Sequence, residues 1–385
     1  MRFRRLLILC VYTPFAALLA LFRVRVLAIT HPDRIGHLAV EPDCYIKEGR
    51  LGLRRELFSV LVVPRSKVAN GALLELWAKQ LPVVASDFWY AILSPLAKVP
   101  YISHSLAPYA VAIDDTATCA AIQARWHGRP SLLSLSDKAA GEGRSRLREL
   151  GLPAGAWFVC VHSREGGYSS DDEHLHSYRN SDIGTYRLAM EAIVARGGWC
   201  IRMGDASSKA LPRLEGVIDY AHSSLKGDAM DVFLCASCRF FLGNSSGLAF
   251  LASVFGVPNA LANLVPVSSS LPLMPDDIGI PKILQRRHSR EALKFTEILS
   301  SPIGNYRFAS LYSKEGIVVV DNDAEDIRDL AVEMLDICAQ RVDYTQEDQE
   351  RQLRFQALMR PGHYSFGAAS RVGRSFLRRY AELLG

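Results

Sequence analysis

The segment from residue 157 to residue 205 constrains the fold of this chain more than any other. An apolar run at 157–161 leads into the polar turn H-S-R-E-G-G (162–167). Apolar side chains with helical spacing follow at 182–196, and a second short apolar run occupies 199–203. This order predicts a strand, a polar loop, a helix and a second strand parallel to the first. Parallel strands place the residues that follow them along one edge of the sheet, where such sheets bind ligands.

The same alternation of strands and helices extends through most of the chain. Further strands are predicted at 24–30, 58–63, 81–86, 217–221, 240–243, 259–263 and 317–320. Helices are predicted at 35–45, 70–79, 88–101, 228–237, 248–255 and 324–341, and the tail at 364–384 ends in one more. The pattern is typical of α/β proteins, and we predict two Rossmann-like domains that face a cleft, preceded by an apolar helix.

The length of the chain, 385 residues, is sufficient for two hydrophobic cores. A Gly-Leu-Pro sequence at 151–153 is the best candidate for a boundary between them. We therefore predict a membrane-associating helix at 1–23, an N-terminal Rossmann-like domain at 24–150, and a C-terminal Rossmann-like domain with a terminal helix at 151–385.

Residues 6–22 form an apolar run flanked by five arginines, Arg2, Arg4, Arg5, Arg23 and Arg25. The run is slightly short for a transmembrane span and contains Pro14. It predicts a helix that lies on, or anchors at, the cytoplasmic face of the membrane, where the arginines attract anionic lipid. A buried first helix is the alternative. The scattered cysteines suit a reducing cytosol, so the expected location is cytoplasmic and peripheral, or N-terminally anchored.

The composition argues against two classes of partner. The net charge of +5 is small, and no Arg-Gly segment alternates with aromatic residues, so no nucleic-acid partner is expected. Of the eight cysteines, only Cys235 and Cys238 form a C-x-x-C pair, and no second pair completes a zinc site. We expect the cysteines to pack in the core and the protein to bind no metal.

A second motif, G-N-S-S-G at 243–247, stands between a predicted strand and a predicted helix. The free N–H groups of a first helical turn, together with the hydroxyls of Ser245 and Ser246, would form a site for an anion. Gly247 would let a phosphate approach the backbone closely. The alternative is that Ser245 simply caps the helix.

Three cations follow predicted strands or stand close to them. Arg164, with His162 beside it, could clamp a phosphate through two parallel hydrogen bonds. Arg202 stands at the end of the 199–203 strand and should face the same edge. Arg179 belongs to a polar cluster at 178–182, in which Asp182 could either cap the following helix or contact a ligand.

The sequence D-R-I-G-H at 33–37 follows the first predicted strand. Asp33 and His37 are the candidates for a base that removes a proton from a hydroxyl. Each could equally be a helix cap or, for His37, a residue that faces the core.

Taken together, the motifs at 162–164, 176–182, 201–204 and 243–247 resemble a family of bacterial glycosyltransferases with a GT-B-like fold. The His-x-Arg turn is also distantly similar to that of fucosyltransferase-like enzymes. The resemblance covers roughly residues 24–340. It implies that Arg164 contacts the donor diphosphate and helps the nucleotide to leave, and that His162, Ser245, Ser246 and Gly247 bind the donor.

Glu165 stands where many relatives carry a second basic residue, so Arg179 or Arg202 would supply the missing charge. The resemblance assigns acceptor binding to 24–150 and donor binding to 151–385. It implies metal-independent transfer of a hexosyl or deoxyhexosyl group from a nucleotide-diphosphate-sugar to a cell-surface glycan or lipid-linked acceptor, without a cofactor. A nucleotide-sugar epimerase of the same architecture and a non-catalytic protein that binds nucleotide-sugar or glycan are the alternatives.

Overall fold

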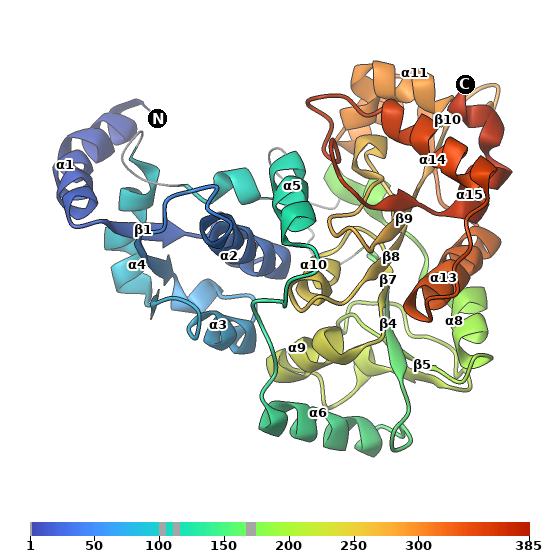
Figure 1. The fold of residues 1–385 in the computed structure, drawn as a ribbon, viewed down its shortest axis with the longest axis horizontal. Helices are drawn as coiled ribbons and strands as arrows, with labels where there is room; N and C mark the ends of the chain where they lie inside the picture. Colours follow the sequence, from blue (N-terminus) through green and yellow to red (C-terminus); the bar gives the residue numbers. More distant parts are fainter. Residues whose placement is uncertain (1, 100–104, 111–115, 167–174) are drawn as a thin grey trace. The chain divides into compact units, whose positions relative to one another are not determined.

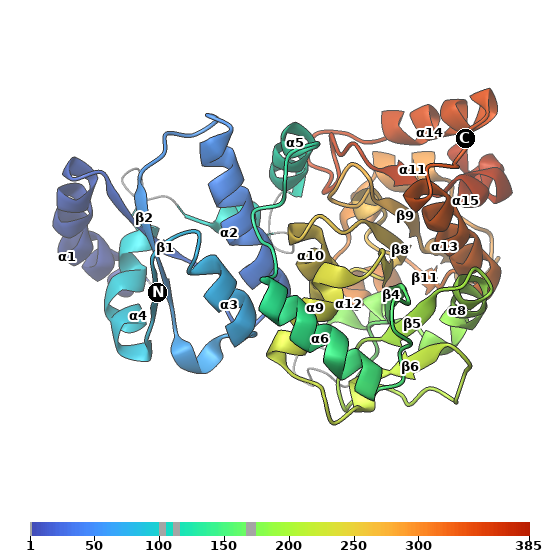
Figure 2. The same ribbon diagram turned by 60° about the horizontal axis from the view of Figure 1, so that its bottom comes forward.

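The computed structural model describes residues 2–99, 105–110, 116–166 and 175–385. The chain forms two compact units, Met1–Ser134 and Leu135–Gly385. The two units divide between Ser134 and Leu135, one helix before the boundary predicted at residue 150, because helix α6 (Asp137–Glu149) belongs to the second unit. There α6 packs against α9 (Asp228–Ser237), and a Cβ atom at Gly143 would lie 2.2 Å from the ring of Phe233. Figure 2 shows the two helices side by side.

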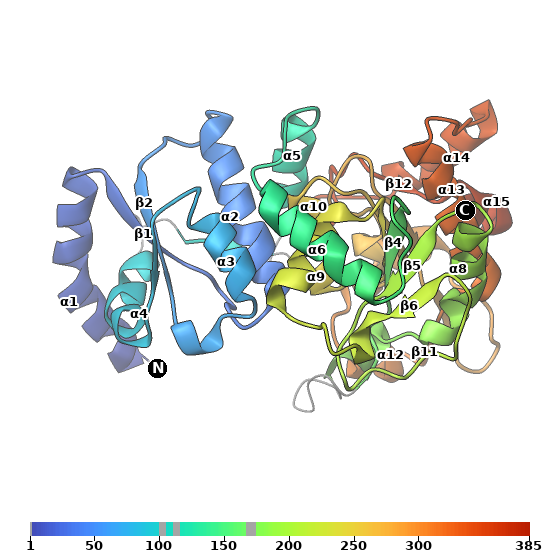
Figure 3. The same ribbon diagram turned by 90° about the horizontal axis from the view of Figure 1, so that it is seen from below.

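The first unit contains a three-stranded parallel sheet of order β1-β2-β3. The strands are β1 (Val24–Ala28), β2 (Phe58–Val63) and β3 (Val83–Ala85), close to the predicted ranges. Helices α1 (Arg2–Leu21) and α4 (Asp87–Leu93) lie on one face, and α2 (Ile35–Arg50) and α3 (Gly71–Trp77) lie on the other (Figure 3). Helix α5 (Thr116–Trp126) packs against α2.

The apolar segment at 6–22 corresponds to helix α1, which contains Pro14. Tyr12, Ala16 and Leu19 of this helix pack around Leu96 and Val99 of the same unit. Over the parts of the chain that the structure describes, no helix combines the length and the apolar character needed to cross a bilayer.

The second unit is built on a seven-stranded parallel sheet of order β12-β9-β8-β7-β4-β5-β6. Its strands are β4 (Phe158–His162), β5 (Trp199–Arg202), β6 (Val217–Asp219), β7 (Phe241–Gly243), β8 (Asn259–Leu264), β9 (Ile278–Pro281) and β12 (Arg371–Val372). From β4 the chain moves outward to β5 and β6, then returns and moves the other way from β7. The order therefore reverses between β4 and β7, which is where doubly wound sheets bind ligands.

Helices cover both faces of this sheet (Figure 1). Helices α8 (Arg187–Val194) and α13 (Ala324–Cys338) pack together on one face, and α9 and α10 (Gly247–Val254) lie on the other. The other helices with described bounds are α11 (Phe295–Ser300), α12 (Ala309–Lys314), α14 (Gln346–Ala357) and α15 (Arg374–Arg379). The predicted strand at 317–320 is β11 (Ile317–Val320), which pairs antiparallel with β10 (Ile283–Arg286) outside the large sheet.

Short 3₁₀ helices complete the described elements: η1 (Arg65–Lys67), η2 (Ser94–Lys98), η3 (Ala107–Tyr109), η4 (Ser177–Arg179), η5 (Ile183–Tyr186), η6 (Tyr220–His222), η7 (Val267–Ser269), η8 (Pro302–Asn305) and η9 (Ala381–Leu384). The helix predicted at 182–196 is η5 followed directly by α8, because its first turn is tighter than an α-helix.

Candidate functional site

The two motifs that the sequence singled out lie side by side at the point where the strand order reverses. Strand β4 ends at His162 and β7 ends at Gly243, and these two residues are paired in register. A Cβ atom at Gly243 would lie 2.6 Å from the carbonyl oxygen of His162, so only glycine fits at the end of β7. The predicted donor residues His162, Arg164 and 245–247 therefore come from adjacent strand ends.

Asn244 connects the two strand ends to the polar loop, by which we mean residues 175–182. Its Oδ1 accepts a hydrogen bond from the backbone N–H of Arg164 at 3.0 Å. Its Nδ2 donates to Ser181 Oγ at 3.1 Å and to the carbonyl of Arg179 at 3.4 Å. Ser163 Oγ also donates to the carbonyl of Ser181 at 2.6 Å. The polar loop is thus fixed against both strand ends before any ligand binds.

Two arginines are held beside the first turn of α10. Arg164 Nη1 donates to the carbonyl of His176 at 3.2 Å and to Oδ1 of Asn180. Arg179 Nη2 donates to the carbonyl of Ser245 at 2.8 Å and lies 3.4 Å from its Oγ. Both residues are of intermediate exposure. These contacts place two fixed positive charges near the positive end of a helix.

Ser246, rather than Ser245, is the residue that precedes α10. Its backbone is extended, with φ −137° and ψ 162°, but its side chain makes no capping hydrogen bond. The residue is 9% exposed, and its Oγ has no hydrogen-bond partner among the described residues. A buried hydroxyl without a partner costs about 1–3 kcal/mol. The capping alternative therefore does not explain this serine, whereas an anion at the helix terminus would provide the missing partner.

Lys282 also belongs to this region and was not predicted from the sequence. Lys282 follows β9 and is 2% exposed. Its Nζ donates to the carbonyl of Asn180 and to Oδ1 of Asp321, both at 2.6 Å. Burial lowers the pKa of this lysine, and the Asp321 carboxylate opposes that effect. The side chain ties the polar loop to the end of β9. The only sequence signal was a single lysine after an apolar strand.

His162 is neutral at physiological pH. Burial lowers its pKa to about 4, even though its Nδ1 lies 3.2 Å from the carbonyl oxygen of Met203. A carbonyl can only accept, so Nδ1 carries the hydrogen and Nε2 is left with a lone pair. His162 can therefore accept a hydrogen bond from a hydroxyl, but it adds no positive charge for a phosphate.

Arg202, at the end of β5, is held by two carboxylates within the fold. This residue is 1% exposed, and its guanidinium donates to Asp219 at 3.1 Å and to Glu165 at 2.9 Å. Two carboxylates therefore compensate its charge within the fold, and we leave it out of the candidate ligand-binding set. Glu165, which stands in place of the expected second cation, is instead the partner of this buried arginine.

Asp182 makes the contact expected of a helix cap. Its Oδ1 accepts from the backbone N–H of Gly184 at 2.9 Å at the start of η5, and Lys209 Nζ lies 3.4 Å away. The side chain is 54% exposed. Of the two interpretations of Asp182, the described contacts are those of capping.

The first unit holds a separate polar group after β1. Asp33 is exposed in the turn before α2, whereas His37, in the first turn of that helix, is 8% exposed. His37 Nδ1 lies 2.7 Å from Oε1 of Glu41, which is fully buried. Thr30 contacts the same carboxylate through both its N–H and its hydroxyl. Glu41 was not predicted, although the spacing H-x-x-x-E on a helix was a usable signal.

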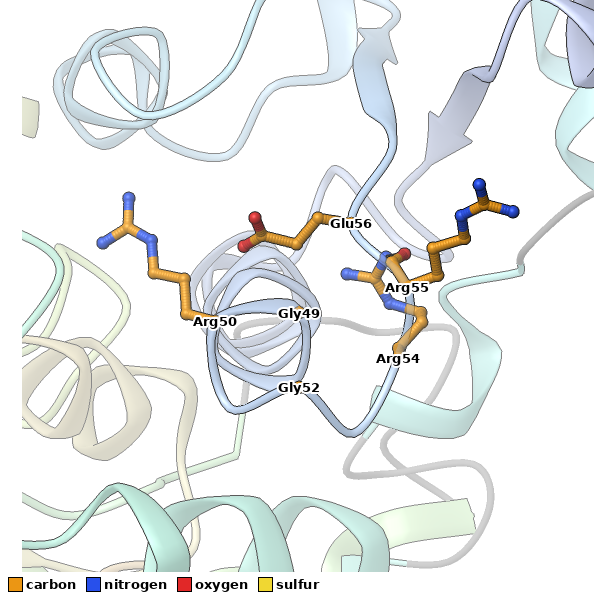
Figure 4. A pocket seen from close by; sticks show the side chains of 6 residues that line it. All are labelled: Gly49, Arg50, Gly52, Arg54, Arg55 and Glu56. Carbon is orange, nitrogen blue, oxygen red and sulfur yellow. Dashed lines mark hydrogen bonds between the residues drawn. The ribbon is translucent and has the colours of Figure 1, made fainter.

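A shallow pocket of about 690 Å³ lies elsewhere in the first unit, at the end of α2 and before β2 (Figure 4). It is lined by Gly49, Arg50, Gly52, Arg54, Arg55 and Glu56. Arg54 packs 3.7 Å above the ring of Tyr45 and pairs with Glu48, so it is already engaged. Arg50 and Arg55 point away from each other (Figure 4). The pocket faces the negative end of α2, which disfavours an anion, and we assign it no function.

Within the described ranges, no group of three or more histidine, cysteine or acidic side chains could hold a metal ion. Cys235 and Cys238 are buried as free thiols, with Cys238 Sγ 3.6 Å from the carbonyl of Cys235. The C-x-x-C pair thus packs in the core, as expected.

No protein-family model matches the sequence, and no curated protein does. Among solved structures, the chain is similar to TibC of enterotoxigenic E. coli, an iron-containing dodecameric heptosyltransferase solved with ADP-D-β-D-heptose. The identity is 14%, the match covers 62% of this chain and 58% of TibC, and the TM-score is 0.36. The chain thus spans little more than half the length of TibC.

Two further similar structures are a family 9 glycosyltransferase from Veillonella parvula and the E. coli ADP-heptose LPS heptosyltransferase II. The first is 8% identical over 62% of this chain and 79% of that chain, with a TM-score of 0.35. The second is 14% identical over 61% of this chain and 83% of that chain, with a TM-score of 0.33. Similarity at this level is too low to support a functional argument. The geometry of the site therefore carries the functional conclusion.

Proposed function

We propose that the protein is a glycosyltransferase with a GT-B-like architecture. It transfers a hexosyl or deoxyhexosyl group from a nucleotide-diphosphate-sugar to a cell-surface glycan or lipid-linked acceptor. The observation that carries this proposal is the buried, unpartnered hydroxyl of Ser246 at the N-terminus of α10, beside the fixed guanidinium groups of Arg164 and Arg179. A diphosphate fits this arrangement, because it brings two adjacent anionic groups to two arginines and one helix terminus.

The proposed reaction forms one bond and breaks one. The acceptor hydroxyl oxygen bonds to the anomeric carbon, and the bond from that carbon to the diphosphate oxygen breaks. The electron pair stays on the nucleoside diphosphate, where Arg164, Arg179 and the α10 terminus stabilise the added charge. Because these groups already supply positive charge to the leaving group, we propose that transfer needs neither a metal nor a cofactor.

The acceptor must also lose a proton. We propose His37 as the base and Asp33 as the alternative, since both follow β1. His37 is the better candidate, because the contact with Glu41 fixes its ring, whereas Asp33 lies in an exposed turn. His162 accepts a hydrogen bond at Nε2 from a hydroxyl group of the nucleotide-sugar, consistent with its neutral state.

We propose that α1 holds the enzyme at the cytoplasmic face of the membrane, close to lipid-linked acceptors. One side of α1 packs into the unit. On a neighbouring side, the side chains of Val11 (47% exposed), Phe15 (59%) and Leu18 (51%) face outward. Helix α4, on the same face of the sheet, adds two more exposed aromatic residues, Phe88 (65% exposed) and Trp89 (49%). Such a face suits an interfacial helix with basic flanks.

Nucleoside diphosphates test the donor site directly. Uridine, guanosine, adenosine and thymidine diphosphates would be added to the full-length protein and the unfolding midpoint measured. A ligand at one hundred times its Kd stabilises the native state by about 2.7 kcal/mol, so a genuine donor nucleotide raises the midpoint. Failure of all four to shift the midpoint would overturn the donor-site assignment.

Turnover separates the proposal from its alternatives. Radiolabelled UDP-glucose, GDP-mannose, GDP-fucose and dTDP-rhamnose would be incubated with the protein, with and without a bacterial lipid extract. Transfer predicts label in the lipid fraction and release of the nucleoside diphosphate only when the extract is present. A new nucleotide-sugar formed without the extract would identify an epimerase, and binding without any product would identify a non-catalytic protein.

Vesicle sedimentation tests the membrane proposal. The double variant Phe15→Asp/Leu18→Asp should bind phosphatidylglycerol vesicles at least tenfold more weakly than the wild type, because burial of each large apolar side chain contributes about 1.5–3 kcal/mol. Leu353→Asp is a matched control, because Leu353 is 63% exposed on α14 in the other unit. Equal binding of the three proteins would contradict a membrane role for α1.

A further inference from the structure

Lys282 is a buried cation that joins three segments far apart in the sequence. It follows β9, and its side chain is 2% exposed. Its Nζ donates at 2.6 Å to the carbonyl of Asn180 in the polar loop and at 2.6 Å to Oδ1 of Asp321, which follows β11. These partners lie 102 and 39 residues away along the chain. A buried ammonium group is costly unless it is paired and hydrogen-bonded, so the two contacts restrict the lysine to one position.

Asn180 passes this restraint on to Arg164. The carbonyl of Asn180 accepts from Lys282, and its Oδ1 accepts from Nη1 of Arg164. The same Nη1 donates to the carbonyl of His176, at the start of the polar loop, at 3.2 Å. The backbone N–H of Ser181 donates in return to the carbonyl of Arg164 at 3.0 Å. The polar loop therefore offers two acceptors to one guanidinium nitrogen, and the direction of the guanidinium depends on where the loop is held.

We propose that Lys282 is a positioning residue of the donor site, which holds Asn180 so that the guanidinium of Arg164 is directed at the diphosphate before the ligand binds. This inference rests on the donor site proposed above. Two parallel hydrogen bonds to a phosphate require a fixed orientation of the guanidinium plane. A side chain that is already ordered also loses less entropy when it binds. Lys282 acts only through Asn180, because burial and its two partners keep Nζ inside the protein.

The substitution Lys282→Met removes both hydrogen bonds and keeps an unbranched side chain of similar length. Asp321 is 38% exposed, so water can hydrate its carboxylate in the variant, and we expect the protein to fold. Lys47→Met is the matched control, because Lys47 is an equally buried lysine of the first unit. Its Nζ contacts Asp43 on α2 and Gln123 on α5, each at 2.8 Å.

Nitrogen NMR of the full-length protein with ¹⁵N-labelled arginine reads the restraint without any ligand. A guanidinium held by hydrogen bonds rotates slowly and gives separate Nη signals, whereas a rotating one gives averaged signals. The Arg164 signals are assigned by their absence in Arg164→Lys. We expect separate signals in the wild type and in Lys47→Met. We expect averaged signals in Lys282→Met and in Asn180→Ala, which removes the side-chain acceptor. Averaged Arg164 signals in the wild type would overturn the inference, whether or not Lys282→Met folds.

Isothermal titration calorimetry supplies the second arm of the test, with whichever of the four nucleoside diphosphates raises the unfolding midpoint of the wild type. Lys282→Met should bind it about tenfold more weakly, the lower end of the contribution of one hydrogen bond to a charged group. Asn180→Ala should lose a similar factor. The double variant should bind no more weakly than either single variant, because both changes release the same guanidinium. Lys47→Met should bind as the wild type does.

The outcomes separate this inference from the donor site on which it rests. Wild-type affinity in Lys282→Met, or a further tenfold loss in the double variant, would refute the positioning role and leave the donor site intact. Equal losses in Lys282→Met and Lys47→Met would also refute it, because the effect would then be one of general destabilisation. Absence of binding by the wild type would instead overturn the donor site, and the inference with it.

Discussion

His162 and His37 stand near the ends of parallel strands in different units, yet their ring nitrogens face different kinds of partner. His162 Nδ1 faces the carbonyl oxygen of Met203, and His37 Nδ1 faces the carboxylate of Glu41. A carbonyl cannot compensate a positive ring, so burial lowers the pKa of His162 to about 4. A carboxylate can stabilise an imidazolium. The position after a strand is therefore not enough to define the role of a histidine, because the role depends on the partner.

The same contrast extends to the charges around each histidine. Arg164, Arg179 and the terminus of α10 gather positive potential at the end of β4 and β7, which suits a ligand with negative charge. The group after β1 is built around a buried carboxylate, which suits proton capture.

The largest effect is expected from Arg164→Ala. Removal of an arginine that stabilises charge on a phosphate costs about 10³-fold or more in turnover, so transfer should be lost. The shift in unfolding midpoint caused by the nucleoside diphosphate should also disappear, while the apo protein unfolds cooperatively. Arg187→Ala is the matched control, because Arg187 is 61% exposed on α8 and pairs only with Glu191 in the described contacts. Full activity of Arg164→Ala would refute the assignment of the donor site.

The next effect concerns stability and pH. The pKa of His162 is about 4 in the folded protein and about 6.5 in an unfolded chain, so the unfolded state binds the proton more tightly. The free energy of unfolding should therefore fall by up to about 3 kcal/mol as the pH drops from 6.5 toward 4. His162→Asn keeps a donor for the Met203 carbonyl but cannot titrate.

Urea unfolding at pH 7 and pH 4 measures this difference. The wild type should lose more free energy of unfolding between the two pH values than His162→Asn does, and His288→Asn, at an exposed position, should match the wild type. Equal pH dependence in all three proteins would show that His162 is not a buried neutral group.

Ser246→Ala separates ligand binding from helix capping. A hydrogen bond to a charged ligand contributes about 1.5–3 kcal/mol, so the affinity for the nucleoside diphosphate should fall roughly 10- to 100-fold. The free energy of unfolding of the apo protein should not fall, because Ser246 Oγ has no partner among the described residues.

Ser136→Ala provides the opposite control. The Ser136 side chain accepts from the backbone N–H of Ala139 and caps α6, so its removal should cost about 1 kcal/mol of stability and leave nucleotide affinity unchanged. If Ser246→Ala lowered the free energy of unfolding and left nucleotide affinity unchanged, as expected for Ser136→Ala, Ser246 would be an ordinary N-cap residue.

Most strands of both sheets were predicted from the sequence, whereas β9, β10 and β12 were missed. Strands such as β4 are apolar on both faces, so a continuous apolar run reveals them. Strand β12 has only two residues, and β9 has the sequence I-G-I-P, in which a glycine and a proline weaken the strand signal. Strand β11 was predicted from its apolar run, but sequence alone did not show that it pairs outside the large sheet.

The candidate site was predictable only where its residues are neighbours in the chain. The sequence identified the turns at 162–164 and 243–247, and the topology brings them together. It placed Arg202 at the end of a strand, but it did not reveal that Glu165 and Asp219 reach this residue from the ends of two other strands. Lys282 was missed for the same reason, since its partner Asn180 is 102 residues away. Contacts between strand ends depend on strand order, which no local pattern contains.

The smallest effect is expected from Asp182→Ala, which tests the cluster that the sequence left evenly balanced between capping and binding. The variant loses the hydrogen bond from Gly184 N–H, so it should lower the free energy of unfolding by about 0.5–1 kcal/mol. The affinity for the nucleoside diphosphate should stay within twofold of the wild type, because the described partners of Asp182 are the helix terminus and Lys209. A tenfold loss of affinity with unchanged stability would instead place Asp182 beside Arg179 in the binding site, and the anionic ligand would then have to present a hydroxyl to it.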